Sequence, residues 1–146
     1  MTFELNIPIA GDAPFGIYLK DDKATYRTLR NAFNAAQASF RGLSETPESL
    51  INRDLQGANA AAWSSLREGC ERTLAETSKD LEVICWWVAA MLHGDNPLEN
   101  TSKALQALAD YVGSNLDHLQ PILPEMKLKG ETSEAQGAEI AELKLR

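Results

Sequence analysis

The stretch TSKDLEVICWWVAAML, at residues 77–92, decides the fold. Asp80 precedes a segment that is apolar over most of the circumference of a helix, and its carboxylate can cap that helix or stabilise the positive end of the helix dipole. Neighbouring side chains on a helix point about 100° apart, so Trp86 and Trp87 are both buried only where other helices surround this one. The sequence therefore predicts a central helix that starts at Thr77 or Ser78, has Asp80 in its first turn and runs to residue 92.

Apolar residues also recur at steps of three and four on both sides of this segment, as on one face of an amphipathic helix. Such stripes at residues 26–40, 63–74 and 105–119 predict three further helices, the first of which should end near Gly42. Capping residues predict where these helices start: Asp21 or Asp22 for the first, Asn59 for the second, and Thr101 or Ser102 for the third. The Thr46-Pro47-Glu48 signature predicts an additional short helix that ends at Gly57.

The predicted fold class is all-α, a single bundle-like domain of about five or six helices with an extended N-terminal segment. Four proline and glycine residues at positions 8–16 exclude a long helix there. We expect the domain to span residues 1–124. Residues 125–146 are expected to be a linker and, from Ala138, the start of a following helix, as in a chain truncated within a longer protein.

Fourteen Lys and Arg residues against 21 Asp and Glu give the 146-residue chain a formal charge of −7. That balance argues against nucleic-acid binding and would steer the protein towards a basic partner surface. The chain has no stretch of about 20 apolar residues that could span a membrane, and its N-terminus lacks the features of a signal peptide. We therefore expect a cytoplasmic protein without membrane insertion, in which Cys70 and Cys85 are reduced core thiols.

No constellation in the sequence points to catalysis. The glycine-rich phosphate loops, the HExxH zinc motif and the GxSxG nucleophile motif are missing. His93 ends the central helix, where it can bond the last carbonyls, and it lies about 12 Å along the axis from Cys85, too far for a thiol–imidazole pair. We predict no catalytic residue, no cofactor, no metal ligand and no enzyme activity.

Two features suggest an interaction surface. Trp87 is either an exposed interface anchor, since aromatic residues are enriched at interfaces, or a core residue beside Trp86. The polar face of the first helix is either solvated or a docking surface. The candidate interaction residues are Tyr18, Arg27, Arg30, Asn34 and Trp87, and structural roles are assigned to Trp63, Asp80 and Trp86.

Five segments share the pattern of one protein family: GIYLK (16–20), YRTLRNAFN (26–34), ASFRGLSETP (38–47), SKDLE (78–82) and GDNPL (94–98). Over about residues 10–124 the chain resembles the N-terminal ImpA-type domain of the TssA/TagA family of bacterial type VI secretion proteins. The first two segments resemble TagA-like accessory proteins more than core TssA. Core members often have a Gly-Asp-Leu element and a late tryptophan, and this chain has Ala13 after Gly11-Asp12 and Leu116 at the tryptophan position.

The resemblance implies a non-enzymatic assembly role in type VI secretion. TssA-like proteins contact baseplate, tube and sheath, and TagA-like proteins hold the distal sheath end at the opposite membrane and stop its polymerisation. The resemblance also implies that the full-length protein forms a homo-oligomer through a C-terminal region missing here. It is compatible with a full-length protein located at the inner face of the inner membrane. The alternatives are a generic cytoplasmic helical adaptor or dimerisation module, and a small helical enzyme with an unrecognised site.

Overall fold

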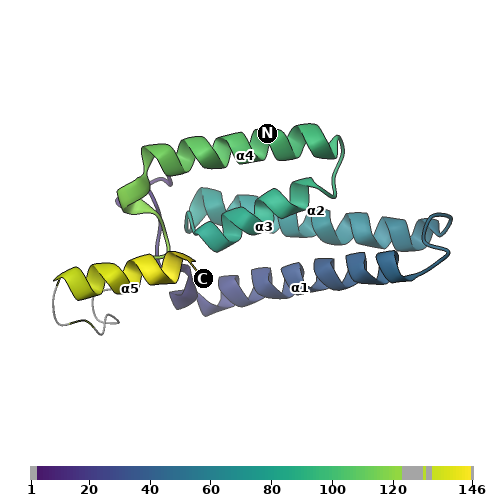
Figure 1. The fold of residues 1–146 in the computed structure, drawn as a ribbon, viewed down its shortest axis with the longest axis horizontal. Helices are drawn as coiled ribbons and strands as arrows, with labels where there is room; N and C mark the ends of the chain where they lie inside the picture. Colours follow the sequence, from purple (N-terminus) through teal and green to yellow (C-terminus); the bar gives the residue numbers. More distant parts are fainter. Residues whose placement is uncertain (1–2, 123–129, 131–132, 146) are drawn as a thin grey trace.

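Five α-helices make up the structure, a computed structural model that describes residues 3–122, 130 and 133–145. Two long helices form an antiparallel hairpin, a shorter helix lies against it, and a fourth covers that one (Figure 1). These residues form no β-strand, so the predicted all-α class is confirmed. The elements in chain order are η1 (Leu19–Asp21), α1 (Lys23–Glu45), α2 (Arg53–Glu76), α3 (Leu81–Met91), α4 (Pro97–Ser114), η2 (Leu116–His118) and α5 (Ser133–Leu145), where η marks a 3-10 helix.

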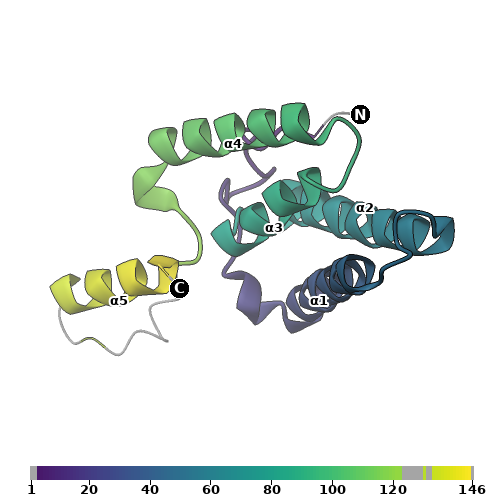
Figure 2. The same cartoon turned by 45° about the vertical axis from the view of Figure 1, so that its right-hand side comes forward.

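Helix α3 lies at the centre, between the α1–α2 hairpin and α4 (Figure 2). Its residues Val83 and Ile84 are fully buried in one cluster with Leu66, Cys70 and Leu74 of α2. Each such side chain stabilises the fold by about 1.5–3 kcal/mol relative to an exposed position. The predicted central helix is therefore present, but it begins at Leu81 and not at Thr77 or Ser78, because Asp80 is its N-cap.

The turn between α1 and α2 replaces the short helix predicted at Thr46. Residues 47–51 form turns, and Asn52 caps α2 by accepting a backbone N–H of its first turn at 3.1 Å. The prediction is wrong because the Thr46 hydroxyl donates to the carbonyl of Gly42 at 2.7 Å, and so closes α1 instead of opening a new helix. By contrast, Asp22 caps α1 as expected.

Two residues expected at helix ends lie inside α2. Gly57 was expected to end a helix, but nothing lies near the place where a side chain would start, and the helix continues through it. Asn59 was expected to cap a helix. It is instead buried, and its amide oxygen accepts the indole N–H of Trp63 at 3.1 Å.

Helix α4 begins at Pro97, earlier than the predicted Thr101 or Ser102. Asn96 adopts a left-handed conformation with φ 46°, which turns the chain so that the proline occupies the first helical position. Helix α5 begins five residues before the expected Ala138. Residues 125–129, 131 and 132 of the expected linker lie outside the described residues.

The N-terminal segment runs from α4 past α3 to the start of α1 (Figure 2). It contains no α-helix, as predicted, but it is turned and not continuously extended, since the Ile9 N–H donates to the Pro14 carbonyl at 2.9 Å. Its residues Leu5 and Ile9 are 2% and 8% exposed. Gly16 pairs with Ser78 and has φ +80°, and a Cβ added there would lie 2.3 Å from the Thr77 carbonyl oxygen. Only glycine allows this close approach of the two backbones.

Candidate protein-interaction surface

Ser78, Lys79 and Asp80 are buried polar residues just before α3, and the first two attach the N-terminal segment to the helices. The Ser78 hydroxyl donates to the carbonyl of Ile17 at 2.7 Å, and the Lys79 ammonium donates to the carbonyl of Leu5 at 2.8 Å. Because these partners lie 61 and 74 residues away in sequence, Ser78 and Lys79 close the fold over a long distance.

Burial shifts the pKa values of both Lys79 and Asp80. Burial lowers the pKa of Lys79 to about 8, and the ammonium lies 5.7 Å from the centre of the Phe3 ring. Burial also raises the pKa of Asp80, although the N–H groups of Glu82 and Val83 oppose this by donating to its carboxylate at 2.9 and 3.4 Å. The predicted cap at Asp80 is confirmed.

Both adjacent tryptophans of α3 are buried, each with 5% exposure. Trp86 stacks on Phe33 of α1 with 5.0 Å between ring centres. Trp87 faces the other way, where the edge of Phe3 covers its ring and its indole N–H donates to Glu71 at 3.2 Å. The expectation that Trp87 is an exposed anchor is therefore wrong, because the N-terminal segment covers it.

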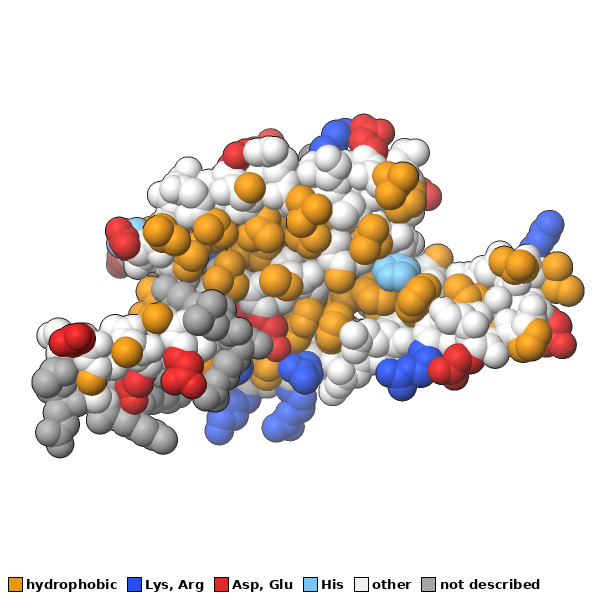
Figure 3. Space-filling model, viewed as in Figure 1, with side chains coloured by type: hydrophobic (Ala, Val, Ile, Leu, Met, Phe, Trp, Pro, Cys, Tyr) orange, Lys and Arg blue, Asp and Glu red, His pale blue; other side chains and the backbone are white. Residues whose placement is uncertain are grey.

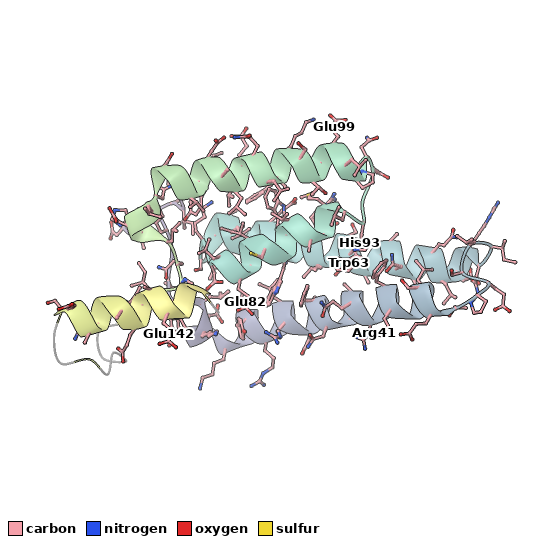
Figure 4. The ribbon with its side chains drawn as sticks, in the orientation of Figure 1. Arg41, Trp63, Glu82, His93, Glu99 and Glu142 are labelled. Carbon is pink, nitrogen blue, oxygen red and sulfur yellow. The ribbon has the colours of Figure 1, made fainter. Side chains whose placement is uncertain are left out.

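Trp63 has the structural role expected of it. It is 5% exposed and stacks on His93, with 3.8 Å between ring centres and 8° between ring planes (Figure 4). The edge of Phe40 meets the same imidazole at 4.8 Å. Burial lowers the pKa of His93, so the neutral ring is favoured. The imidazole thus joins α1 and α2 to the end of α3.

The predicted polar face of α1 is present at the surface. Arg27, Arg30 and Asn34 are exposed, and Tyr18 is half-buried just before η1. Arg30 donates to the carboxylate of Glu82 at 3.1 Å, which connects α1 to the first turn of α3. The structure therefore brings three of the five candidate residues together on one helix, while Trp87 lies in the interior.

A second surface, which sequence reasoning missed, crosses α3 and α4. Figure 3 shows hydrophobic side chains gathered along both helices on one side of the molecule. None of the side chains that form it carries a charge, and contiguous apolar surface of this kind marks interaction sites. We call it the apolar platform, and its residues are Leu81, Cys85, Val88 and Leu92 along α3, with Leu98, Leu105 and Val112 of α4.

The platform is exposed because α3 is not surrounded on all sides. Leu92 and Leu105 are each 51% exposed, and Leu98 is 81% exposed. Cys85, expected in the core, is exposed as well, whereas Cys70 is fully buried as predicted. The sequence signal was available, since Leu81, Cys85, Val88 and Leu92 recur at helical spacing, but it does not tell a buried face from an exposed one.

A groove of about 520 Å³ lies on the opposite side of α4 from the platform. Phe3, Trp87 and Ala104 line its apolar part, and Arg67 and Glu71 are among its polar residues. Within residues 3–122, 130 and 133–145, no group of three or more His, Cys, Asp and Glu side chains could hold a metal ion. No helix in the same residues is long and apolar enough to cross a bilayer.

An all-α domain with a pre-formed, uncharged surface of this kind has the features of a protein-binding module. A family model described as ImpA, N-terminal, type VI secretion system matches residues 7–143. The chain therefore belongs to the ImpA N-terminal family, which connects it with type VI secretion and confirms the family resemblance. No curated protein and no solved structure matches the chain.

Proposed function

We propose that this domain is a non-enzymatic docking module that contacts sheath, tube or baseplate proteins of a type VI secretion system. Through these contacts it controls the assembly of the contractile sheath or its termination. The proposal rests on the apolar platform, a surface that is exposed in this member of the family and contains no charged side chain. Burying such a surface against a partner yields roughly 25 cal/mol per Å² of apolar area.

The finer proposal concerns the branch of the family. The segments GIYLK at residues 16–20 and YRTLRN at 26–31 resemble TagA-like members, which favours a role in ending sheath polymerisation. Such a protein would work on the cytoplasmic side, and the full-length protein would be a homo-oligomer. The platform also allows a different role, pairing of two copies, in which case the domain would be a dimerisation module.

A pull-down with the purified chain tests the proposed function. Immobilised protein is mixed with purified sheath, tube and baseplate proteins, and light scattering measures its own mass. We expect retention of at least one of these proteins by a monomeric chain. Leu105→Asp should abolish retention, because it places a charge in the platform, and Leu50→Asp should not, because Leu50 is 88% exposed in the distant α1–α2 turn.

Two results would contradict the proposal. One is that none of the three classes of protein is retained. The other is a chain that is dimeric in solution and becomes monomeric with Leu105→Asp, which would assign the platform to self-association. A circular-dichroism melt of each variant confirms that it is folded.

A further inference from the structure

We infer that the platform receives an amphipathic helix of a partner protein, whose apolar stripe is bordered by Asp and Glu. This inference rests on the proposed function and names the chemistry of the partner at the same surface. The inference rests on one observation: the uncharged platform on α3 and α4 lies beside a row of cations on α1.

Two contacts between α1 and the two ends of α3 show how α1 lies beside the platform. Arg30 meets Glu82 in the first turn of α3, and Phe40 meets His93 just after its end. The two helices therefore run side by side in the same direction, and Arg41, which follows Phe40 on α1, lies at the lower edge of the molecule (Figure 4). A helix laid along α3 would have α1 on one side and α4 on the other.

The shape of the platform suits a helix. Its residues on α3 follow steps of four, three and four, which form a continuous stripe on one helix face. Leu92, Leu98 and Leu105 also line a hollow of about 420 Å³ where α3 ends and α4 passes. A large apolar side chain of the partner can enter this hollow, as the anchors of helix-in-groove complexes do.

The charge of α1 is opposite to that of the whole chain. The helix has one carboxylate, Glu45, and the chain has a net charge of −7. In Figure 3 its basic side chains line the lower edge, below the apolar band. The exposed cations of α1 are Lys23, Arg27, Arg30 and Arg41, and because Arg30 is paired with Glu82, the other three supply the net positive charge of this border.

This charge pattern selects among possible occupants. A helix with acidic borders complements α1, whereas a helix with basic borders would place like charges together. A second copy of this chain is the less favoured occupant, because its own platform is bordered by the same α1 cations and does not offer the acidic borders that complement them. Exposed charge pairs contribute little affinity, so the apolar stripe supplies most of the binding and the cations supply the selection.

Two designed peptides test the inference on the 146-residue chain. Both are helices of about 18 residues, roughly 27 Å long, with one leucine stripe. One has glutamate along the borders of the stripe and the other has lysine. Fluorescence anisotropy at low salt should show the glutamate peptide binding about ten-fold tighter, and the difference should shrink as ionic strength rises.

Variants of α1 separate the two parts of the surface. The double variant Arg27→Glu with Arg41→Glu should reverse the preference, so that the lysine peptide binds tighter. Arg72→Glu, an exposed substitution on α2, should leave the preference unchanged. Leu105→Asp should weaken the binding of both peptides, since both place their leucine stripe on the platform.

A measurement on the unmodified protein locates the binding site. Cys85 is exposed in the platform and Cys70 is fully buried, so a small alkylating reagent reacts first at Cys85. The glutamate peptide should slow this reaction, because a helix on α3 covers the thiol. An unchanged rate in the presence of bound peptide would overturn the placement.

Equal binding of the two peptides, or binding of neither, would also overturn the inference. These results are distinct from failure of the proposed function. If a secretion protein is retained and Leu105→Asp releases it while the Arg27 and Arg41 substitutions do not, the docking role stands and the acidic helix is wrong. If no secretion protein is retained, the docking role fails whichever peptide binds.

Discussion

The stability of the fold depends on pH through Lys79, a buried ammonium group. Burial lowers the pKa of its ammonium from 10.5 to about 8. In the unfolded chain the ordinary pKa returns, so between these two values the unfolded state binds more protons than the folded state. The contribution of Lys79 to stability therefore increases with pH across this window, by about 2 kcal/mol between neutral pH and about pH 9.5.

Urea denaturation of the unmodified chain and of Lys79→Met at both pH values measures this contribution. The raised pKa values of Cys70 and Tyr111 also affect stability at alkaline pH, but they do so in both proteins and cancel in the difference. Lys23→Met, at an exposed position, is the control and should show no such increase. The prediction would be contradicted if the difference in unfolding free energy between Lys79→Met and the unmodified chain were the same at both pH values.

Trp86 is a core residue whose contribution to stability can be measured with a single substitution. It is 5% exposed and packs between Phe33 and Tyr26 of α1, with ring centres 5.0 and 6.2 Å away. Trp86→Ala should therefore lower the free energy of unfolding by about 3–5 kcal/mol. Cys85→Ala, at the neighbouring exposed position, should change it by less than about 0.5 kcal/mol. Circular-dichroism melts compare the two, and equal melting temperatures would show that Trp86 is not a core residue.

At the scale of the element, alanine substitutions of two glycines should have opposite effects on stability. Gly57 lies inside α2 with open space around it, so Gly57→Ala should stabilise the protein by about 0.5–1 kcal/mol. Gly16→Ala should destabilise it strongly, because its φ is +80° and the new Cβ would meet the Thr77 carbonyl. Thermal melts measure both changes. Destabilisation by Gly57→Ala would support a helix end at residue 57.

The helices could be predicted because their apolar spacing is local information. The ends were less predictable, since side-chain hydrogen bonds decide them. At the α1–α2 turn, the Gln56 amide donates to the carbonyls of Ser49 and Leu50 at 2.8 and 3.1 Å and so stabilises a turn where the sequence favours a helix start. Asn59 is of a residue type that commonly caps helices, but its amide oxygen accepts the indole N–H of Trp63 instead.

The candidate site was only partly predictable for a related reason. Arg27, Arg30 and Asn34 were identified because polar residues at helical spacing on an amphipathic helix face solvent. Trp87 and the platform depend on which neighbours cover each side of α3. The N-terminal segment covers Trp87, whereas the outer side of α3 has no covering helix among the described residues, and the sequence of α3 alone contains neither fact.

At the scale of the whole molecule, the two ends of the domain meet at the start of α3. Gly16 pairs with Ser78 on one side, Asp80 pairs with Gln120 on the other, and the Gln120 amide donates to the carbonyl of Gly16 at 3.0 Å. A perturbation of the N-terminal segment should therefore reach all the packed helices together. It should not loosen that segment alone.

Leu5→Ala tests this cooperativity. Leu5 is 2% exposed in the same cluster as the buried residues of α2, α3 and α4, so its truncation should cost about 2–4 kcal/mol. Tryptophan fluorescence and far-ultraviolet circular dichroism should still follow one urea transition, shifted to lower concentration. Ile7→Ala, at a position that is 57% exposed, is the matched control and should shift it little. Two separated transitions in Leu5→Ala would show that the N-terminal segment unfolds independently of the helices it covers, and that the contacts of Ser78 and Lys79 do not unite the domain.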